Sequence, residues 1–100
     1  MQTVPLKRVT IIAEAVLEER LIREIKALGA KGYTLTAARG EGSRGVRASE
    51  WAGQNVKLET LVSAEVADRL LTHLAERYFA HYAVVAYVEN VAVVRGEKYT

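Results

Sequence analysis

The order in which two kinds of apolar pattern alternate constrains the fold of this chain most strongly. Leu6–Ala13 is rich in β-branched residues and predicts a strand. Leu17–Leu28 then places apolar residues at three- and four-residue steps, which predicts a helix with one apolar face. Gly29 is of the residue type that commonly ends helices, and Tyr33–Ala38 predicts a second strand. The first part of the chain therefore has the order strand, helix, strand.

The same order returns in the second part of the chain. Val56–Val62 alternates and predicts a third strand. Apolar residues recur at four-residue steps over Val66–Phe79, which predicts a second amphipathic helix. Tyr82–Glu89 predicts a fourth strand, and we expect a short extension, Val91–Arg95, after a break near Asn90.

A doubled strand–helix–strand unit predicts an α+β fold of the ferredoxin-like type, βαββαβ, in a single domain over residues 1–100. In this fold a four-stranded antiparallel sheet carries both helices on one face and leaves the other face uncovered. The fourth strand offers apolar side chains to both faces, with Val84, Ala86 and Val88 on one side and Val85 and Tyr87 on the other. Because exposed apolar surface of this kind is a liability in a monomer, we expect a homo-oligomer, and a small cyclic ring satisfies the geometry.

The connection between the second and third strands is unusually long. It has roughly 15 residues, against about two to five in a common hairpin, and it contains Gly40–Arg47, with the sequence GEGSRGVR. Glycines let main-chain N–H groups approach an anion, and Arg44 and Arg47 add planar donors that suit phosphate or carboxylate oxygens. Two interpretations stay open, an anion-binding loop or a mobile linker. Trp51, in the same connection, could insert into a partner or fold back onto its own subunit.

The composition argues against several classes of function. The chain has no cysteine, which excludes disulfides, thiol catalysis and cysteine metal sites. Its two histidines, His73 and His81, do not have the spacing of a metal site, so we expect no metal. The net charge is only +2, and the basic residues of the long connection are interleaved with Glu41 and Glu50. We therefore expect no nucleic-acid partner.

Compartment and chemistry follow from similar observations. No stretch approaches the roughly 20 apolar residues of a membrane span, and the N-terminal residues do not resemble a signal peptide, so we expect a cytoplasmic protein without membrane insertion. Ser43 has no histidine nearby in sequence, and the carboxylates are scattered, with Glu14 at the end of the first strand as the one exception. We expect no catalytic residues and no enzyme. The polar residues 18–26 of the first helix, and His73, are interpreted as solvated.

Three segments resemble the PII-like signalling proteins, and specifically the branch associated with bicarbonate transporters and carboxysome gene clusters. These segments are Gly29–Thr34, Gly40–Arg47 and Arg77–Phe79 followed by Tyr82 and Ala83. The resemblance covers nearly the whole chain, and the run GxGSRxVR is its specific part. It implies a homotrimer with adenine nucleotides in the clefts between subunits. It also implies that the long connection is the T-loop of that family, which closes over the phosphates and reports their presence to a partner.

The resemblance also implies roles for individual residues. Gly40, Gly42 and Ser43 would supply N–H and hydroxyl donors, and Arg44 and Arg47 would contact phosphate oxygens. The residues that would lie near the nucleoside are Glu14, Tyr82, Ala83 and Val84. Glu41 stands where similar bicarbonate-transporter regulators carry a lysine, which favours AMP or ADP over ATP. For the carboxysome-associated relatives, the resemblance further implies bicarbonate as a second ligand.

These observations favour a non-enzymatic sensor of AMP or ADP, with bicarbonate as a further candidate ligand and no tightly bound cofactor. Its T-loop would regulate inorganic-carbon uptake or fixation through a bicarbonate transporter or a carboxysome-related protein. Two alternatives stay open. One is an enzyme that slowly hydrolyses nucleotide phosphates with the help of both arginines, and the other is a structural adaptor subunit of a carboxysome-related assembly.

Overall fold

A computed structural model of the chain describes residues 1–40 and 54–99. The elements are, in chain order, β1 (Thr3–Glu14), a 3₁₀ turn η1 (Ala15–Leu17), α1 (Glu18–Ala27), β2 (Thr34–Ala38), β3 (Asn55–Val62), α3 (Ala64–Arg77), β4 (Val85–Val94) and a second 3₁₀ turn η2 (Gly96–Tyr99). The predicted Arg44, Arg47, Gly42 and Ser43 lie outside the described residues.

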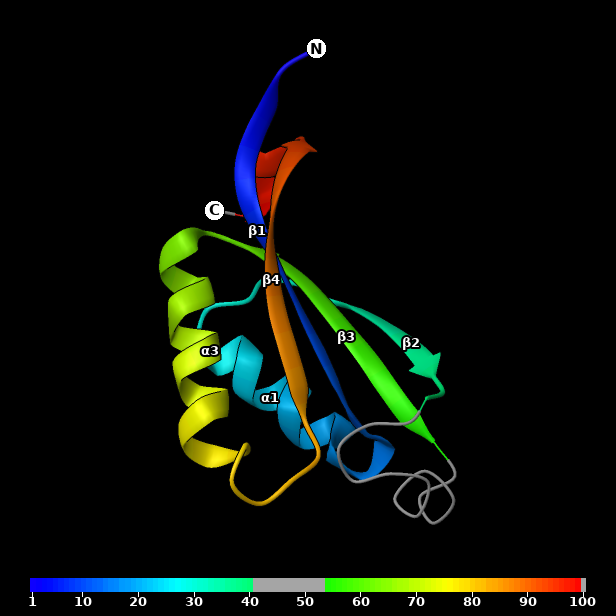
Figure 1. Ribbon diagram of the computed structural model, residues 1–100. Coiled ribbons are helices and arrows are strands. Elements are labelled where there is room, and N and C mark those ends of the chain that lie inside the picture. The colour runs from blue at the N-terminus through cyan, green and yellow to red at the C-terminus, as the bar shows by residue number, and fades with distance from the viewer. Residues whose placement is uncertain (41–53, 100) are drawn as a thin grey trace.

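The strands form one four-stranded sheet in the order β2-β3-β1-β4, and every neighbouring pair is antiparallel. Both α1 and α3 lie on the same side of this sheet (Figure 1). The two strands added by the second strand–helix–strand unit therefore lie one on each side of β1. This arrangement confirms the predicted ferredoxin-like fold, because its order of elements and its single helical layer are both present.

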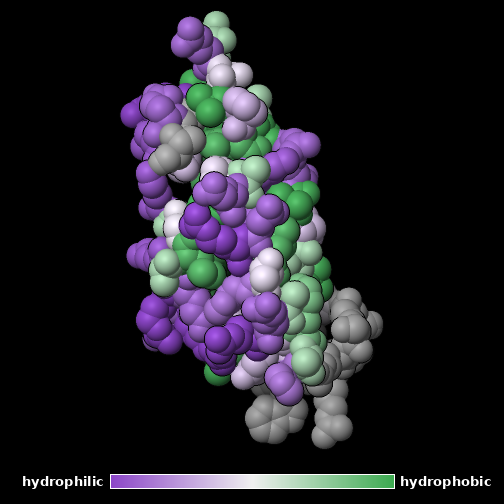
Figure 2. Space-filling view, turned by 90° about the vertical axis from the view of Figure 1, so that its left-hand side faces the viewer, coloured by the Kyte–Doolittle hydropathy of each residue, from purple (hydrophilic) through white to green (hydrophobic). Residues whose placement is uncertain are grey.

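The core lies between the sheet and the two helices. Inward residues of the central strands, such as Ile11 and Leu58, meet Leu21 of α1 and Leu70 of α3, and each of these side chains is at most 1% exposed. Burying a side chain of this size contributes roughly 1.5–3 kcal/mol. The outer side of the helices is mainly hydrophilic, as Figure 2 shows. The two helices therefore cover one face of the sheet, and neither of them covers the other face.

The fourth strand differs from its prediction in two places. The predicted break near Asn90 is wrong, since β4 runs without interruption from Val85 to Val94. Asn90 pairs with Lys7 of β1 in the ladder, and the Lys7 ammonium donates a hydrogen bond to the Asn90 side chain. In addition, residues 82–84 form a turn before the strand rather than its first residues.

The uncovered face of the sheet carries apolar side chains, as predicted. Val85 is 51% exposed and Tyr87 is 42% exposed, and both pair with outward residues of β1, Ile12 and Thr10. Val88, next along the strand, pairs with the core residue Val9 and so belongs to the helical side. The apolar outward residues of β4 are the surface on which self-association would act.

Gly29 ends α1 in a conformation that other residues rarely adopt, with a φ of 123°. A Cβ placed there would lie 3.0 Å from Val66 Cγ2 on α3. We expect Gly29→Ala to lower the free energy of unfolding by about 1–3 kcal/mol, because the strained backbone and the contact with α3 act together. Urea denaturation measures the effect. Gly32→Ala is the matched control, since a Cβ at Gly32 meets no atom within 4 Å, and equal losses in the two variants would contradict this account.

Candidate functional site

One end of each of the four strands lies at the same end of the sheet. Glu14 at the end of β1 pairs with Asn55 at the start of β3, and Asn55 also pairs with Ala38 at the end of β2. On the other side of β1, Val85 begins β4 opposite Ile12. The connection between β2 and β3 starts and returns at this end, which is the lower end in Figure 1. The topology therefore places the base of that connection and the turn before β4 at the same end of the sheet, with β3 and β1 between β2 and β4.

The described base of the long connection borders a hollow. This hollow, of about 520 Å³, is lined by Ala37, Ala38, Arg39 and Gln54. The Ala15 N–H donates a hydrogen bond to the Gln54 carbonyl over 3.2 Å, which ties the returning chain to η1. Arg39 is exposed at the lip of the hollow. Sequence reasoning did not single it out, although its place directly before the glycine-rich segment was a usable signal.

The predicted site residues are only partly placed. Gly42, Ser43, Arg44 and Arg47 lie outside the described residues, so their roles stay predictions. Gly40 lies at the described base, and a Cβ there would meet no atom within 4 Å. Packing against residues 1–40 and 54–99 therefore does not require a glycine at this position.

The predicted nucleoside neighbours lie at the same end of the sheet. Glu14 is half-buried at the end of β1, and its side chain makes no capping hydrogen bond to η1. Tyr82 and Val84 pack their side chains against the core, and the Val84 N–H donates to the Tyr82 carbonyl over 3.0 Å. The side chains of Tyr82 and Val84 are therefore directed toward the core, and their proximity to a nucleoside stays a prediction.

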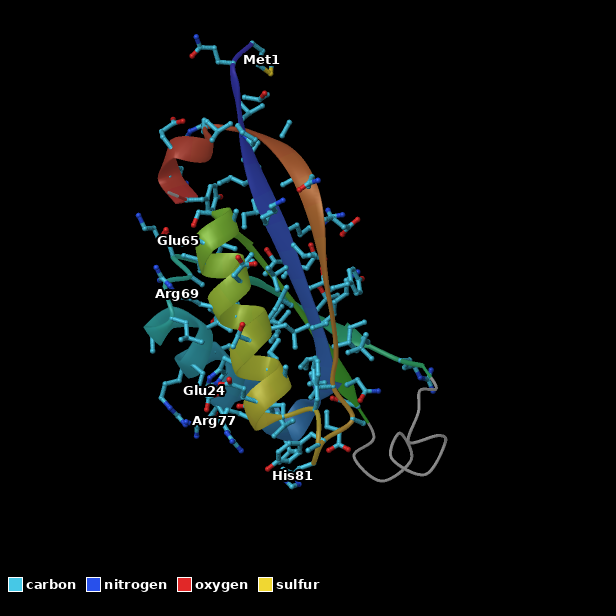
Figure 3. The ribbon with its side chains drawn as sticks, turned by 60° about the vertical axis from the view of Figure 1, so that its left-hand side comes forward. Met1, Glu24, Glu65, Arg69, Arg77 and His81 are labelled. Carbon is cyan, nitrogen blue, oxygen red and sulfur yellow. The ribbon has the colours of Figure 1, made fainter. Side chains whose placement is uncertain are left out.

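A polar cluster joins α1 to α3 and to the turn before β4. Glu24 Oε1 accepts hydrogen bonds from the Tyr78 hydroxyl at 2.6 Å and from His73 Nε2 at 2.7 Å. Glu24 Oε2 accepts one from Arg20 Nε at 3.2 Å. The prediction that these residues are solvated is wrong for Glu24 and His73, whose side chains are only 25% and 24% exposed and bind each other. It is confirmed for Glu19, Arg23 and Lys26, which are exposed on the same helix. Figure 3 shows Glu24 on α1 and, at the end of the molecule opposite Met1, His81 in the turn after α3.

The cluster shifts the proton affinity of its members. Desolvation by itself would raise the pKa of Glu24, but the hydrogen bonds from Tyr78, His73 and Arg20 outweigh it and leave this pKa below its ordinary value. Burial, together with the bond to the Glu24 carboxylate, raises the pKa of Tyr78 well above its ordinary value. At neutral pH the cluster therefore holds an ionised carboxylate and a neutral phenol.

A carboxyl group whose pKa is lowered by folding stabilises the protein above the unfolded-state pKa and loses that contribution as pH falls through the folded-state value. The unfolded-state pKa of a glutamate is about 4.3. We therefore expect Glu24→Gln to destabilise the protein most near neutral pH and progressively less as pH falls below about 4.3. Urea denaturation from about pH 7 to about pH 3 measures this difference. Glu19→Gln, exposed on the same helix, is the control, and an identical pH profile for the two variants would contradict the role of Glu24.

A second hollow lies away from the base of the long connection. It measures about 450 Å³ and is lined by Arg8, Lys31–Thr34, Glu59–Leu61 and Lys98–Tyr99. The Thr60 hydroxyl donates to the Gly32 carbonyl over 2.6 Å and fixes one wall. This hollow includes the start of β2, whereas the first hollow includes its end. The two hollows thus present two different surfaces of one subunit, both with basic residues.

Two further properties concern only the part of the chain that the structure describes. Residues 1–40 and 54–99 contain no group of three or more His, Cys, Asp or Glu side chains that could hold a metal ion. Among the same residues, no helix combines the length and the apolar character that crossing a membrane requires.

Comparison with known proteins decides the family. Residues 6–98 match the family described as nitrogen regulatory protein P-II. The chain belongs to the P-II family. A PII-like signalling protein of Thermus thermophilus is 68% identical over 100% of both chains, with a TM-score of 0.88.

More distant solved structures have the same architecture. CPII of Thiomonas intermedia, solved with ADP, AMP and bicarbonate, is 26% identical over 94% of this chain and 98% of CPII, with a TM-score of 0.79. GlnK of B. subtilis, solved with ATP, is 17% identical over 87% of this chain and 82% of GlnK, with a TM-score of 0.64, and shows the fold alone. The resemblance to PII-like proteins is thus confirmed at the level of the family.

Proposed function

We propose that this protein is a non-enzymatic PII-like signal-transduction protein. It senses AMP or ADP in the clefts between the subunits of a homotrimer and transmits their presence through the T-loop between β2 and β3. The observation that carries the proposal is that the loop base, the hollow beside Arg39 and the turn before β4 all lie at the same end of the sheet. Membership of the P-II family and the ADP and AMP bound to CPII support it.

An intersubunit cleft needs one wall from each of two neighbours. In a cyclic ring, adjacent subunits meet through two different patches of the same chain. The two hollows lie at different ends of β2 and offer such a pair of patches. The loop base of one subunit would supply phosphate donors, and the neighbour's hollow would add the ammonium group of Lys98 on the facing wall. The uncovered side of the sheet would close the ring.

In this proposal the loop residues make different contacts with the ligand. Main-chain N–H groups at Gly40 and Gly42, with the Ser43 hydroxyl, donate to phosphate oxygens. Arg44 and Arg47 supply the charge-assisted hydrogen bonds, which are stronger than neutral ones. Glu41 opposes a high negative charge in the ligand and so favours AMP or ADP over ATP. Glu14 and Tyr82–Val84 lie near the nucleoside.

Signalling follows from the difference between loop states. A ligand shifts an equilibrium only by its differential affinity for the two states. Contacts from Arg44 and Arg47 that exist only in the closed loop provide this difference. Bicarbonate, a small oxyanion present in the CPII structure, would bind beside either arginine. We propose that the partner is a bicarbonate transporter or a carboxysome-related protein, so that the occupied loop regulates inorganic-carbon uptake or fixation.

Isothermal titration calorimetry tests the ligand. We expect saturable binding of AMP or ADP, weaker binding of ATP, and a change in nucleotide affinity when bicarbonate is added. Cyclic AMP serves as the comparison for the role of a free phosphate group. The absence of saturable binding for all four nucleotides, with and without bicarbonate, would overturn the proposal.

A subunit-mixing experiment tests the shared cleft. One chain carries Arg44→Ala and Arg47→Ala, and the other carries Lys98→Ala in the second hollow. Each alone is expected to bind ADP weakly. The two chains are co-expressed with different tags so that mixed oligomers can be isolated. In these oligomers, we expect full-affinity sites wherever an intact loop faces an intact hollow. If mixed oligomers bind no better than either parent, the two surfaces do not share a ligand.

A further inference from the structure

The seven residues from Tyr78 to Val84 connect α3 to β4 and include the turn proposed to lie near the nucleoside. Two of their main-chain hydrogen bonds end on the Tyr78 carbonyl. The N–H groups of His81 and Tyr82 donate to the Tyr78 carbonyl over 3.0 and 2.9 Å, and the Tyr78 N–H donates to the Leu74 carbonyl over 2.9 Å. The position of the turn therefore depends on what holds Tyr78 and Tyr82.

Both tyrosines are held from α1. Tyr78 is fully buried, and its hydroxyl donates to Glu24. The ring of Tyr82 lies 5.6 Å from the ring of Tyr78, centroid to centroid, and its hydroxyl accepts a hydrogen bond from Arg20 Nη1 at 3.3 Å. The first residue of the segment and Tyr82 are thus tied to two residues one helical turn apart on α1.

Arg20 contacts every other member of this arrangement. Its guanidinium lies 4.7 Å from the centre of the Tyr78 ring and 5.7 Å from that of Tyr82, and its Nε donates to Glu24. The planar group can stack and donate at the same time, which a lysine ammonium cannot reproduce. Removal of the Arg20 guanidinium takes away the hydrogen bond to the Tyr82 hydroxyl and the contact with the Tyr82 ring, whereas the buried Tyr78 hydroxyl keeps Glu24 as its acceptor.

We propose that Arg20 is a positioning residue that holds the turn at residues 79–84 in the geometry that binds the nucleotide. The inference rests on the proposed function, since it assigns α1 a part in the same site. Without Arg20, Tyr82 samples further orientations, and only a fraction of the molecules presents the binding geometry. The apparent affinity then falls by that fraction, although Arg20 itself contacts no ligand.

The test compares ADP binding by Arg20→Met, Tyr82→Phe and the double variant. Methionine keeps an apolar stem against the rings and removes the guanidinium, and phenylalanine removes the hydroxyl that accepts from Arg20. We expect the dissociation constant to rise about 5-fold or more in Arg20→Met, with an unchanged number of sites. The double variant should be no weaker than Arg20→Met, since both changes break the same contact. Arg20→Lys should recover the affinity only in part.

Hydrogen exchange separates positioning from general destabilisation. The amides of His81, Tyr82 and Val84 should exchange faster in ligand-free Arg20→Met, and saturating ADP should restore their protection. Arg23→Ala, an exposed arginine on the same helix, should change neither affinity nor exchange. Wild-type affinity in Arg20→Met, or additive effects in the double variant, would overturn the inference alone. If the wild-type protein binds no ADP, the proposed function fails and the role of Arg20 in binding fails with it.

Discussion

Replacing Arg44 and Arg47 together by alanine is expected to weaken ADP binding by about 100-fold or more. Each arginine is proposed to make a charge-assisted hydrogen bond to a phosphate oxygen, and losing one such bond costs roughly 1.5–3 kcal/mol. The single variants should therefore each lose roughly 10-fold or more. Calorimetry on the oligomeric protein measures the change. The loss should be smaller for AMP than for ADP, because AMP has fewer phosphate oxygens for the two arginines to share.

The control for this double variant is Arg23→Ala together with Arg95→Ala. It removes the same number of positive charges from exposed positions on α1 and after β4. If this control weakens ADP binding as much as the loop variant does, the effect comes from the overall charge of the protein rather than from contacts. Unchanged binding in the loop variant would show that the arginines do not touch the phosphates, and the proposed role of the loop would be lost.

The fold was predictable from sequence because its two patterns have different periods. Alternation of apolar residues predicted the strands, and a three-to-four-residue repeat predicted the helices. The order of these elements predicted the ferredoxin-like topology, which the strand order of the sheet confirms. The error in β4 has a local cause. Asn90 is a poor strand residue by propensity, but its pairing with Lys7 on β1 keeps it in the ladder. Propensity alone contains no information about that partner.

The polar cluster could not be found in the same way. Arg20 and Glu24 are four residues apart, as are Tyr78 and Tyr82, and each spacing alone is typical of a helix surface. Only the packing of α1 against α3 brings the two pairs together around Glu24. The buried hydroxyl of Tyr78 was the usable signal, since a tyrosine in an apolar stripe needs a hydrogen-bond partner. The contacts that support the turn could therefore not be predicted from sequence, and the roles of the loop residues stay predictions.

Introducing a charge at Tyr87 is expected to break the oligomer and, with it, nucleotide binding. Tyr87 lies on the uncovered face of the sheet and is 42% exposed in the single subunit. If that face is buried between subunits, Tyr87→Asp places an unpaired carboxylate in an apolar contact, which costs several kcal/mol per subunit. Size-exclusion chromatography with light scattering should show a shift from trimer to monomer. ADP binding should fall below detection at the same time, because a cleft with one wall cannot enclose the ligand.

Val88→Asp is a closely matched control for this prediction. Val88 is 41% exposed and follows Tyr87 directly in β4, but it points to the helical side of the sheet, where it pairs with Val9. A folded Val88→Asp protein should remain trimeric and bind ADP, because the face that it alters is not between subunits. If both variants dissociate, the subunits associate through the edge of β4 and not specifically through the outward face of the sheet. If Tyr87→Asp stays trimeric, the subunits meet elsewhere, and the shared cleft must be built from other surfaces.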